Sequence, residues 1–232
     1  MHRREFVLGC AAGFAASPEA WAAPADAQPK AYARARLVDD RGQPLRARAV
    51  PVRQNLIFHY PFAATPAFLL NLGGPTRAAS DLNTARQERY RWPGGVGPAR
   101  SVVAFSAICA HQLAYPTRDI SFISFRDAAS PGNPRTDVIH CCSEHSQYDP
   151  ADGARVLAGP ATQPLAAILL EHDTRSDELF AVGTLGGELF DAFFAKYQMR
   201  LSLEVGPRAR ERVSGECRVL PMADYCRQQV RC

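Results

Sequence analysis

The sequence predicts an all-β protein, an antiparallel sandwich or barrel, for three reasons. Short apolar segments recur at close and regular intervals, and glycine and proline interrupt them often, with 16 Gly and 18 Pro among 232 residues. The only clear helical periodicity is a short amphipathic segment at residues 188–197. A composition of 47% hydrophobic and 22% charged residues also excludes a disordered chain.

The first half of the chain supplies most of the predicted sheet. The predicted strands are residues 31–38, 46–52, 55–60, 68–72 and 101–108. Residues 39–44 are polar and form a turn, residues 76–91 form a loop or one short helix, and residues 92–98 form a rigid Pro- and Gly-rich connection.

The second half alternates strands with loops and ends the sheet. Its predicted strands are residues 120–125, 138–139, 165–171, 179–185 and 201–205, the last of which closes the sheet. Residues 127–136 form a loop, and the helix at 188–197 places Leu189, Phe193, Phe194 and Tyr197 on one side.

The first 22 residues are typical of a twin-arginine export signal. Arg3 and Arg4 precede a short, weakly apolar segment, and Ala20-Trp21-Ala22 is a cleavage motif. Cleavage leaves 210 residues and removes Cys10, so that the odd count of seven cysteines becomes six. We therefore expect a periplasmic protein; a buried helix and a lipoprotein box ending at Cys10 are the weaker interpretations.

Charge and hydropathy exclude several classes of partner. The net charge of +4 comes from scattered arginines without basic runs, so nucleic-acid binding is not expected. The longest apolar stretch, residues 6–16, is shorter than the roughly 18 to 20 residues that span a membrane. We expect no membrane span in the mature chain.

Two cysteine and histidine pairs carry the predicted chemistry. Cys109 and His111 form a C-x-H pair, Cys142 and His145 form a C-x-x-H pair, and each pair follows a predicted strand. Two loops with one thiolate and one imidazole each suit a two-iron cluster, with both cysteines on one iron and both histidines on the other.

With these pairs the sequence resembles the Rieske iron–sulfur protein family. The resemblance is carried by three segments, ICAHQLAYP, CSEHSQYD and GPATQPL, and more weakly by LVDDRGQPL and FHYPFAATPAFLLNL. It implies a Rieske-type antiparallel β-sandwich with an inserted cluster-binding subdomain at about residues 102–165. The Rieske domain then spans residues 23–205, and a cysteine-containing tail spans residues 206–232.

The resemblance also implies roles for single residues. It makes Cys109, His111, Cys142 and His145 the ligands of a 2Fe-2S cluster. Further residues are implied around that cluster: Ser146 and Tyr148 as hydrogen-bond donors, and Gly159 and Pro160 in the loop that covers it.

Three features depart from the family pattern. Ala114 and Glu144 stand where high-potential members carry a disulfide. The segment after His145 is one residue shorter than the family's His-Gly-Ser-x-Tyr. The 30 residues between His111 and Cys142 make a long connection, consistent with an insertion around residues 126–136.

Other uses of these residues remain open. Two cysteines and two histidines also suit structural zinc, and a disulfide between Cys109 and Cys142 is the plainest alternative. A Rieske oxygenase is not expected, because no D-x-x-H-x-x-x-x-H motif is present. The four remaining cysteines of the mature chain allow three complete disulfide pairings: Cys141, Cys217, Cys226 and Cys232.

The function expected from sequence is one-electron transfer in the periplasm through a Rieske cluster. The chain would serve as the iron–sulfur subunit or partner of a respiratory oxidoreductase rather than as a stand-alone enzyme. Its expected partners are a cytochrome c, a cytochrome b or a molybdenum-oxidase subunit, with a quinol as a further donor. The alternative is a zinc-stabilised periplasmic binding module that uses the same four residues.

Overall fold

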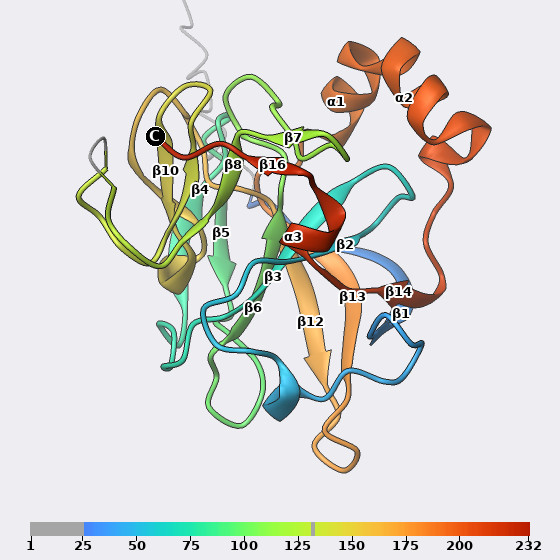
Figure 1. The fold of residues 1–232 in the computed structure, drawn as a ribbon. Coiled ribbons are helices and arrows are strands. Elements are labelled where there is room, and N and C mark those ends of the chain that lie inside the picture. The colour runs from blue at the N-terminus through green and yellow to red at the C-terminus, as the bar shows by residue number, and fades with distance from the viewer. Residues whose placement is uncertain (1–25, 131–132) are drawn as a thin grey trace, which may run out of the picture.

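The computed structural model describes residues 26–130 and 133–232. The predicted export signal at residues 1–22, with Cys10, lies outside them. The predicted all-β class is confirmed, because sheets make up the body of the described chain and its helices are few and short (Figure 1). None of the described helices is long and apolar enough to cross a membrane.

The largest sheet in the described residues has eight strands. In spatial order they are β14 (Gly215–Arg218), β1 (Lys30–Val38), β13 (Leu179–Leu185), β12 (Ala167–His172), β6 (Val102–Ser106), β3 (Pro66–Asn71), β2 (Leu56–His59) and β15 (Leu220–Pro221). The strand pairs are antiparallel except for β1 with β14, which are parallel.

A smaller antiparallel sheet has the order β11-β10-β9-β8. Its strands are β8 (Ile123–Arg126), β9 (Val138–Cys141), β10 (Ser146–Asp149) and β11 (Arg155–Ala158). Two short pairs complete the strands: the hairpin of β4 (Ser80–Asn83) with β5 (Arg89–Trp92), and β7 (Ile120–Ser121) with β16 (Gln228–Gln229) in parallel.

Two hydrophobic cores lie on opposite faces of the central strands. In β3, Phe68 and Leu70 belong to the core shared with the small sheet, whereas Ala67 and Leu69 belong to the core shared with β1 and β2. Successive strand residues face opposite ways, so a strand covered on both faces has no polar alternation. This accounts for the continuous apolar run of β3.

The helices are short. They are α1 (Phe190–Lys196), α2 (Gln198–Glu204) and α3 (Met222–Tyr225), with the 3₁₀ turns η1 (Ala47–Ala49), η2 (Pro150–Asp152) and η3 (Gly206–Arg210). Helices α1 and α2 lie together at one side of the sheets (Figure 1). Phe193 of α1 packs on Tyr115 with ring centroids 4.9 Å apart, and Lys196 Nζ donates a hydrogen bond of 2.5 Å to the Gln112 carbonyl. The helices thus brace the loop that follows β6.

Three predicted elements are wrong. Residues 46–52 contain the 3₁₀ turn η1 in place of a strand, and residues 76–91 contain the β4–β5 hairpin, in which Leu82 and Tyr90 pair across the strands and face the core. Residues 201–205 fall mostly in α2: Leu201 is buried and Leu203 is 84% exposed, so their alternation does not mark a strand.

The C-terminal residues 206–232 extend the sheets. Strand β14 pairs with β1, and β15 pairs with β2. Cys217 is buried in the core between β1 and β2, and Cys226 packs beside Ile57 and Met222. The tail therefore contributes to the packing of the body.

Candidate metal centre

Two loops at the end of the small sheet carry the four predicted ligand residues. Strand β6 leads into the loop of Cys109 and His111, and β9 turns back into β10 through residues 142–145. The strand register places Ile139 opposite Tyr148 and Cys141 opposite Ser146, so these four side chains share one face of the β9–β10 pair, which we call the inner face. The apolar Ile139 and the large Tyr148 ring place this face in the core.

The thiol beside Cys109 is that of Cys141. Both cysteines are buried and unbonded. A hydrogen bond from Cys141 to the Cys109 thiolate lowers the pKa of Cys109 to about 6, against the opposing effect of burial. The same hydrogen bond, with burial and the negative charge on Cys109, raises the pKa of Cys141. The pair therefore holds one negative charge readily and resists a second.

Hydrogen-bond donors surround the Cys109 sulfur. The Tyr148 hydroxyl lies 3.3 Å from Cys109 Sγ and also accepts a hydrogen bond of 3.2 Å from the Ala110 backbone N–H. The backbone N–H of His111 helps to lower the pKa of Cys109, and that of Ser143 acts in the same direction on Cys141. These donors stabilise thiolates, the form of cysteine that binds metals.

The structure corrects the predicted role of Cys142. Its sulfur is bonded to that of Cys232, with 90 residues between the two positions in sequence. Cys142 follows Cys141 directly, so its side chain leaves the opposite face of the chain. The predicted pairings among Cys141, Cys217, Cys226 and Cys232 are corrected as well, since the described disulfide uses Cys232 alone of these four and the other three are free.

The imidazole of His111 is paired with a carboxylate. His111 Nδ1 lies 2.5 Å from Glu144 Oε2, with the His111 side chain 34% exposed and the Glu144 side chain 9% exposed. The second predicted histidine, His145, is exposed and its ring lies 6.0 Å from that of His140. The side chain beside His111 is therefore that of Glu144, whereas the sequence predicted His145 as the partner ligand.

Two buried oxygen atoms near these residues have no protein partner. They are Glu144 Oε1 and Ser146 Oγ, and burying a polar atom without a hydrogen bond costs about 1–3 kcal/mol. Ser146 was predicted to donate a hydrogen bond to the cluster, and it lies across the strand pair from Cys141. These oxygens are suited to a polar or metallic group between the loops.

The loop with Gly159 and Pro160 lies against the turn between β9 and β10. Gly159 has φ = +87°, and a Cβ there would lie 2.5 Å from Ser146 Cα and 2.6 Å from the His145 carbonyl oxygen. Glycine is therefore required at this close approach. Both Gly159 and Pro160 are exposed.

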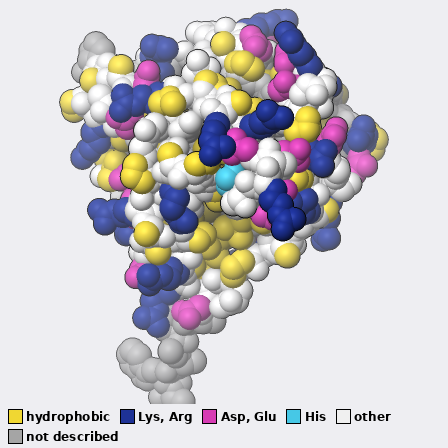
Figure 2. Space-filling view, turned by 90° about the horizontal axis from the view of Figure 1, so that it is seen from below, with side chains coloured by type: hydrophobic (Ala, Val, Ile, Leu, Met, Phe, Trp, Pro, Cys, Tyr) yellow, Lys and Arg dark blue, Asp and Glu magenta, His cyan; other side chains and the backbone are white. Residues whose placement is uncertain are grey.

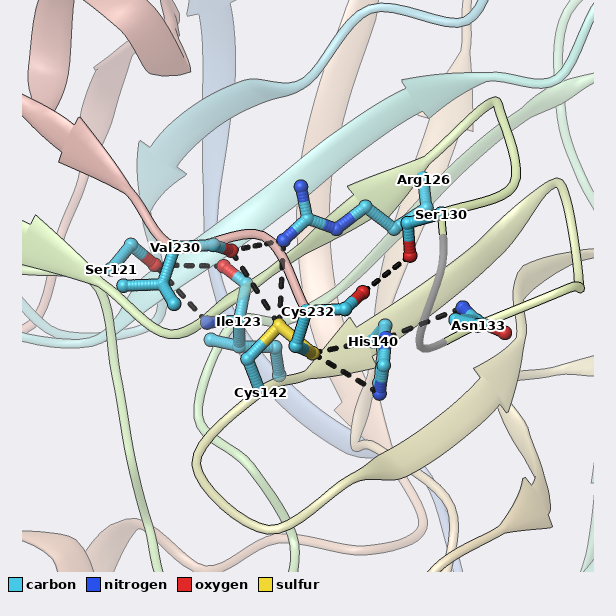
Figure 3. Close-up of a disulfide and its surroundings, with 9 residues drawn as sticks. All are labelled: Ser121, Ile123, Arg126, Ser130, Asn133, His140, Cys142, Val230 and Cys232. Atoms are coloured by element: carbon cyan, nitrogen blue, oxygen red, sulfur yellow. Dashed lines mark hydrogen bonds between the residues drawn. A yellow bond between two sulfur atoms is a disulfide. The ribbon is translucent and has the colours of Figure 1, made fainter.

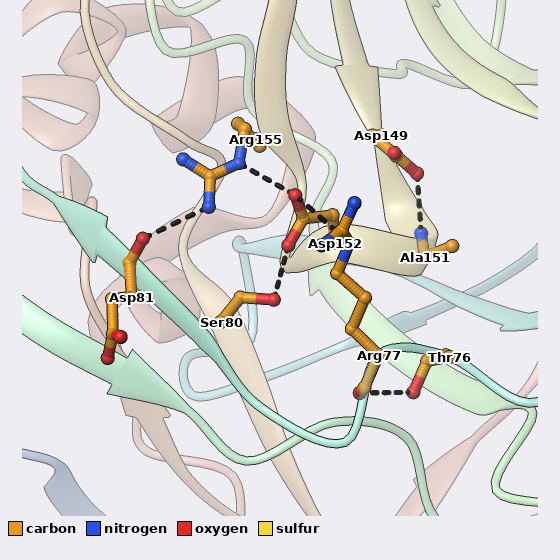
Figure 4. A network of polar contacts seen from close by, with 8 residues as sticks. All are labelled: Thr76, Arg77, Ser80, Asp81, Asp149, Ala151, Asp152 and Arg155. Atoms are coloured by element: carbon orange, nitrogen blue, oxygen red, sulfur yellow. Dashed lines mark hydrogen bonds and ion pairs between the residues drawn. The ribbon is translucent and has the colours of Figure 1, made fainter.

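A carboxylate network fixes the chain beyond Tyr148 (Figure 4). Asp152 of η2 accepts hydrogen bonds from Ser80 and from Arg155 Nε, the latter at 2.7 Å, while Asp149 caps η2 by accepting from the Ala151 N–H at 2.9 Å. Arg155 also bonds the Asp81 carbonyl at 3.0 Å. The β4–β5 hairpin thereby anchors the β10–β11 turn.

The donors of the centre form two pairs rather than one group. In the described residues, three metal-ligating side chains with donor atoms within 4.8 Å of one another are found at His140, His145 and Cys232. Cys109 and Cys141 with His111 and Glu144 do not meet that criterion. Two thiols together with an imidazole and a carboxylate supply four donors, the number that a binuclear group with two protein ligands on each metal requires.

Two residues of this centre were not predicted, although the sequence held signals for both. Alternation along β9 puts Cys141 on the face of Ile139. When residues 144–148 are aligned with the family pattern His-Gly-Ser-x-Tyr without a gap, Glu144 takes the position of the histidine and His145 takes that of the glycine. His145 indeed has φ = +62°, a conformation that favours glycine.

Charges of both signs are interspersed over the face of the molecule drawn in Figure 2.

No family model matches the chain. Among solved structures, it is similar to the soluble domain of the Rieske protein II from Sulfolobus acidocaldarius, with a TM-score of 0.46 and 23% sequence identity over 66% of this chain and 78% of that chain.

Proposed function

We propose that the protein is a Rieske-type one-electron carrier whose two-iron centre is held by Cys109, Cys141, His111 and Glu144. The observation that carries the proposal is the pair of buried, unbonded thiols between two loops, with hydrogen-bond donors directed at the Cys109 sulfur. The unpartnered Ser146 and Glu144 oxygens support it, because Glu144 lies in the turn that follows Cys141 and Ser146 lies opposite Cys141 in the β9–β10 pair.

Each end of the centre has a separate task. Cys109 and Cys141 are the thiolate ligands, and Tyr148, with the backbone N–H groups of His111 and Ser143, stabilises their negative charge. His111 supplies the exposed edge at which a redox partner approaches, since its side chain is 34% exposed whereas both thiols are buried. When bound, a 2Fe-2S cluster supplies reversible one-electron oxidation and reduction.

Glu144 sets this centre apart from one with two histidines. A carboxylate adds negative charge next to the metal and favours the ferric state. Rieske centres with two histidines have potentials of about −150 to +300 mV, and plant-type four-cysteine clusters have about −400 mV. We expect a potential between these ranges.

The proposed setting is the bacterial periplasm after twin-arginine export, with a quinol, a cytochrome or a molybdenum-oxidase subunit as redox partner. The export motif at residues 3–22 supports the location. The motifs around Cys109 and Cys142 support the class of partner by resemblance alone.

The test is metal analysis and an EPR spectrum of the purified, reduced protein. We expect two irons and two acid-labile sulfides per chain, visible absorption, and a rhombic EPR signal with an average g below that of four-cysteine clusters. Cys109→Ser should abolish the signal. Cys217→Ser, which changes another buried free thiol far from the loops, should preserve it.

The alternative zinc module gives the opposite result in the same measurement. Zinc without iron, no visible absorption and no EPR signal after anaerobic reconstitution with iron and sulfide would contradict the electron-transfer proposal.

A further inference from the structure

A second group of metal-ligating side chains lies on the outer side of β9. The donor atoms of His140, His145 and Cys232 all lie within 4.8 Å of one another. Cys142, bonded to Cys232, contributes a fourth potential ligand (Figure 3). In the disulfide, however, neither sulfur carries the negative charge that a metal ligand needs.

The sulfur and nitrogen atoms of this group lie close together, and the His140 ring has to turn for one nitrogen to face a shared ion, because Cys232 Sγ is nearly equidistant from both nitrogens. With Zn–S bonds of about 2.3 Å and Zn–N bonds of about 2.0–2.1 Å, sulfur and nitrogen ligands on one zinc ion lie about 3.6 Å apart. Cys232 Sγ lies 3.7 Å from Nδ1 and 3.8 Å from Nε2 of His140. The Asn133 side-chain amide nitrogen donates to His140 Nδ1 at 3.3 Å, and this contact must be released or reversed before His140 binds a metal.

The chain end stays near β9 without the disulfide. Strand β16 pairs with β7, Val230 N–H donates to the Ser121 carbonyl at 2.8 Å, and Ser130 Oγ donates to the Cys232 carbonyl. Arg126 bonds the Val230 carbonyl and lies 3.6 Å from Cys142 Sγ (Figure 3). Its positive charge favours thiolates at this place once the sulfurs are reduced.

We infer that reduction of the Cys142–Cys232 disulfide creates a zinc site formed by Cys142, Cys232, His140 and His145, separate from the centre of Cys109 and Cys141. A dithiol breaks the S–S bond, gives two electrons and two protons to the sulfurs and becomes a disulfide itself. Zinc then displaces the two thiol protons into solvent. The site thus does not bind zinc in an oxidising compartment, where the disulfide persists, and binds zinc in a reducing one.

The experiment compares zinc binding to the full chain before and after reduction. A phosphine reductant is used because it takes oxygen from water to become its oxide and leaves no competing thiol. Zn²⁺ is titrated against a chromophoric chelator. We expect the reduced wild type to bind one more equivalent than the oxidised wild type, and His145→Gln to lose that equivalent although His145 is exposed and its exchange spares the core.

The two partners of the disulfide provide a matched pair of variants. Cys142→Ser leaves Cys232 as a free thiol beside both histidines, so it should bind zinc without reductant, although more weakly than the reduced wild type, which has all four ligands. Cys232→Ser removes a sulfur from the three-residue group and should weaken this binding at least tenfold. Cys226→Ser, a buried free thiol outside the group, should behave as wild type.

Two results would overturn the inference. One is equal zinc binding by the oxidised and reduced wild type. The other is an extra equivalent that survives both in Cys232→Ser and in His145→Gln. Because iron at Cys109 and Cys141 is measured separately in each sample, failure of the zinc site leaves the electron-transfer proposal unaffected.

Discussion

Cys141 and Cys142 are neighbours in the chain and yet belong to different sites. Cys141 faces the core, is free, and shares hydrogen bonds with Cys109. Cys142 leaves the other side of β9 and is bonded to the C-terminal Cys232. The comparison shows that strand alternation, and not cysteine spacing, decides on which side of the small sheet each sulfur lies.

The two sides differ in how their polar groups are satisfied. On the inner side, Ser146 Oγ and Glu144 Oε1 are buried without partners. On the outer side, the disulfide is surrounded by Arg126, His140 and the backbone of the tail, which already interact with it or with one another. The inner side thus holds two unpartnered oxygens beside the free thiols, whereas the outer side holds one, Ser124 Oγ, which lies opposite His140 in the β8–β9 pair.

The largest expected effect separates the two cysteines. Cys141→Ser should reduce the iron content of reconstituted protein to near zero, because a neutral hydroxyl replaces a thiolate ligand. Cys142→Ser should retain the EPR signal of the wild type. Metal analysis and EPR on both variants provide the measurement. The reverse outcome, with iron lost in Cys142→Ser and kept in Cys141→Ser, would restore the C-x-x-H assignment.

The second effect is on the stability of the outer side. Cys232→Ser removes a cross-link that closes about 90 residues, so the free energy of unfolding should fall by about 2–5 kcal/mol. Urea unfolding under oxidising conditions measures it, with Cys226→Ser as a control that removes no disulfide. Iron bound at Cys109 and Cys141 should persist in Cys232→Ser; its parallel loss would mean that the two sides are not independent.

Much of the fold could be predicted from local pattern. The strands that became β1, β2, β3, β6, β12 and β13 were predicted, because apolar runs bounded by turns suffice for buried strands. The β4–β5 hairpin could not be recognised, since only Leu82, Tyr90 and Trp92 contact the core from a segment that otherwise reads as polar. Helix α2 was missed because Leu201 and Leu203 alternate as in a strand. Only Leu201 is buried, whereas Leu203 stays exposed.

The segments that form the candidate site were singled out from the sequence, whereas the assignment of single residues within them stays a prediction. Cys109 and His111 lie in the loop after β6, and Ser146 and Tyr148 lie in β10. Cys142 was predicted to be a ligand because of its spacing to His145. That spacing does not show on which face of the strand a side chain lies. The Cys142–Cys232 bond joins residues 90 positions apart, and no local rule selects one partner among several tail cysteines.

The third effect tests Glu144 against its neighbour. Glu144→His replaces an anionic ligand by a neutral one, so the reduction potential of the iron centre should rise by on the order of 100 mV. His145→Gln changes a residue on the outer side and should leave the potential nearly unchanged. Redox titration followed by EPR measures both. A large shift in His145→Gln with none in Glu144→His would exclude Glu144 as a ligand.

The smallest effect concerns the hydrogen bond from Tyr148 to Cys109. Tyr148→Phe removes a hydroxyl 3.3 Å from the sulfur, which stabilises the more negative, reduced state. A loss of about 1.4 kcal/mol corresponds to about 60 mV for one electron, so we expect the potential to fall by up to that amount. Tyr90→Phe is the matched control, because Tyr90 lies in the same core and its hydroxyl does not contact a cysteine.

The same variant has a second readout in the metal-free protein. Thiolate absorbance of the wild type should rise with a midpoint near the Cys109 pKa of about 6, and Tyr148→Phe should move that midpoint upward because the thiolate loses a donor. Since this pKa lies below that of the unfolded thiol, stability from this group is present above the unfolded pKa of about 8.5 and is lost as the pH falls through 6. An unchanged midpoint in Tyr148→Phe, together with an unchanged potential, would show that the inner side depends on its backbone donors alone.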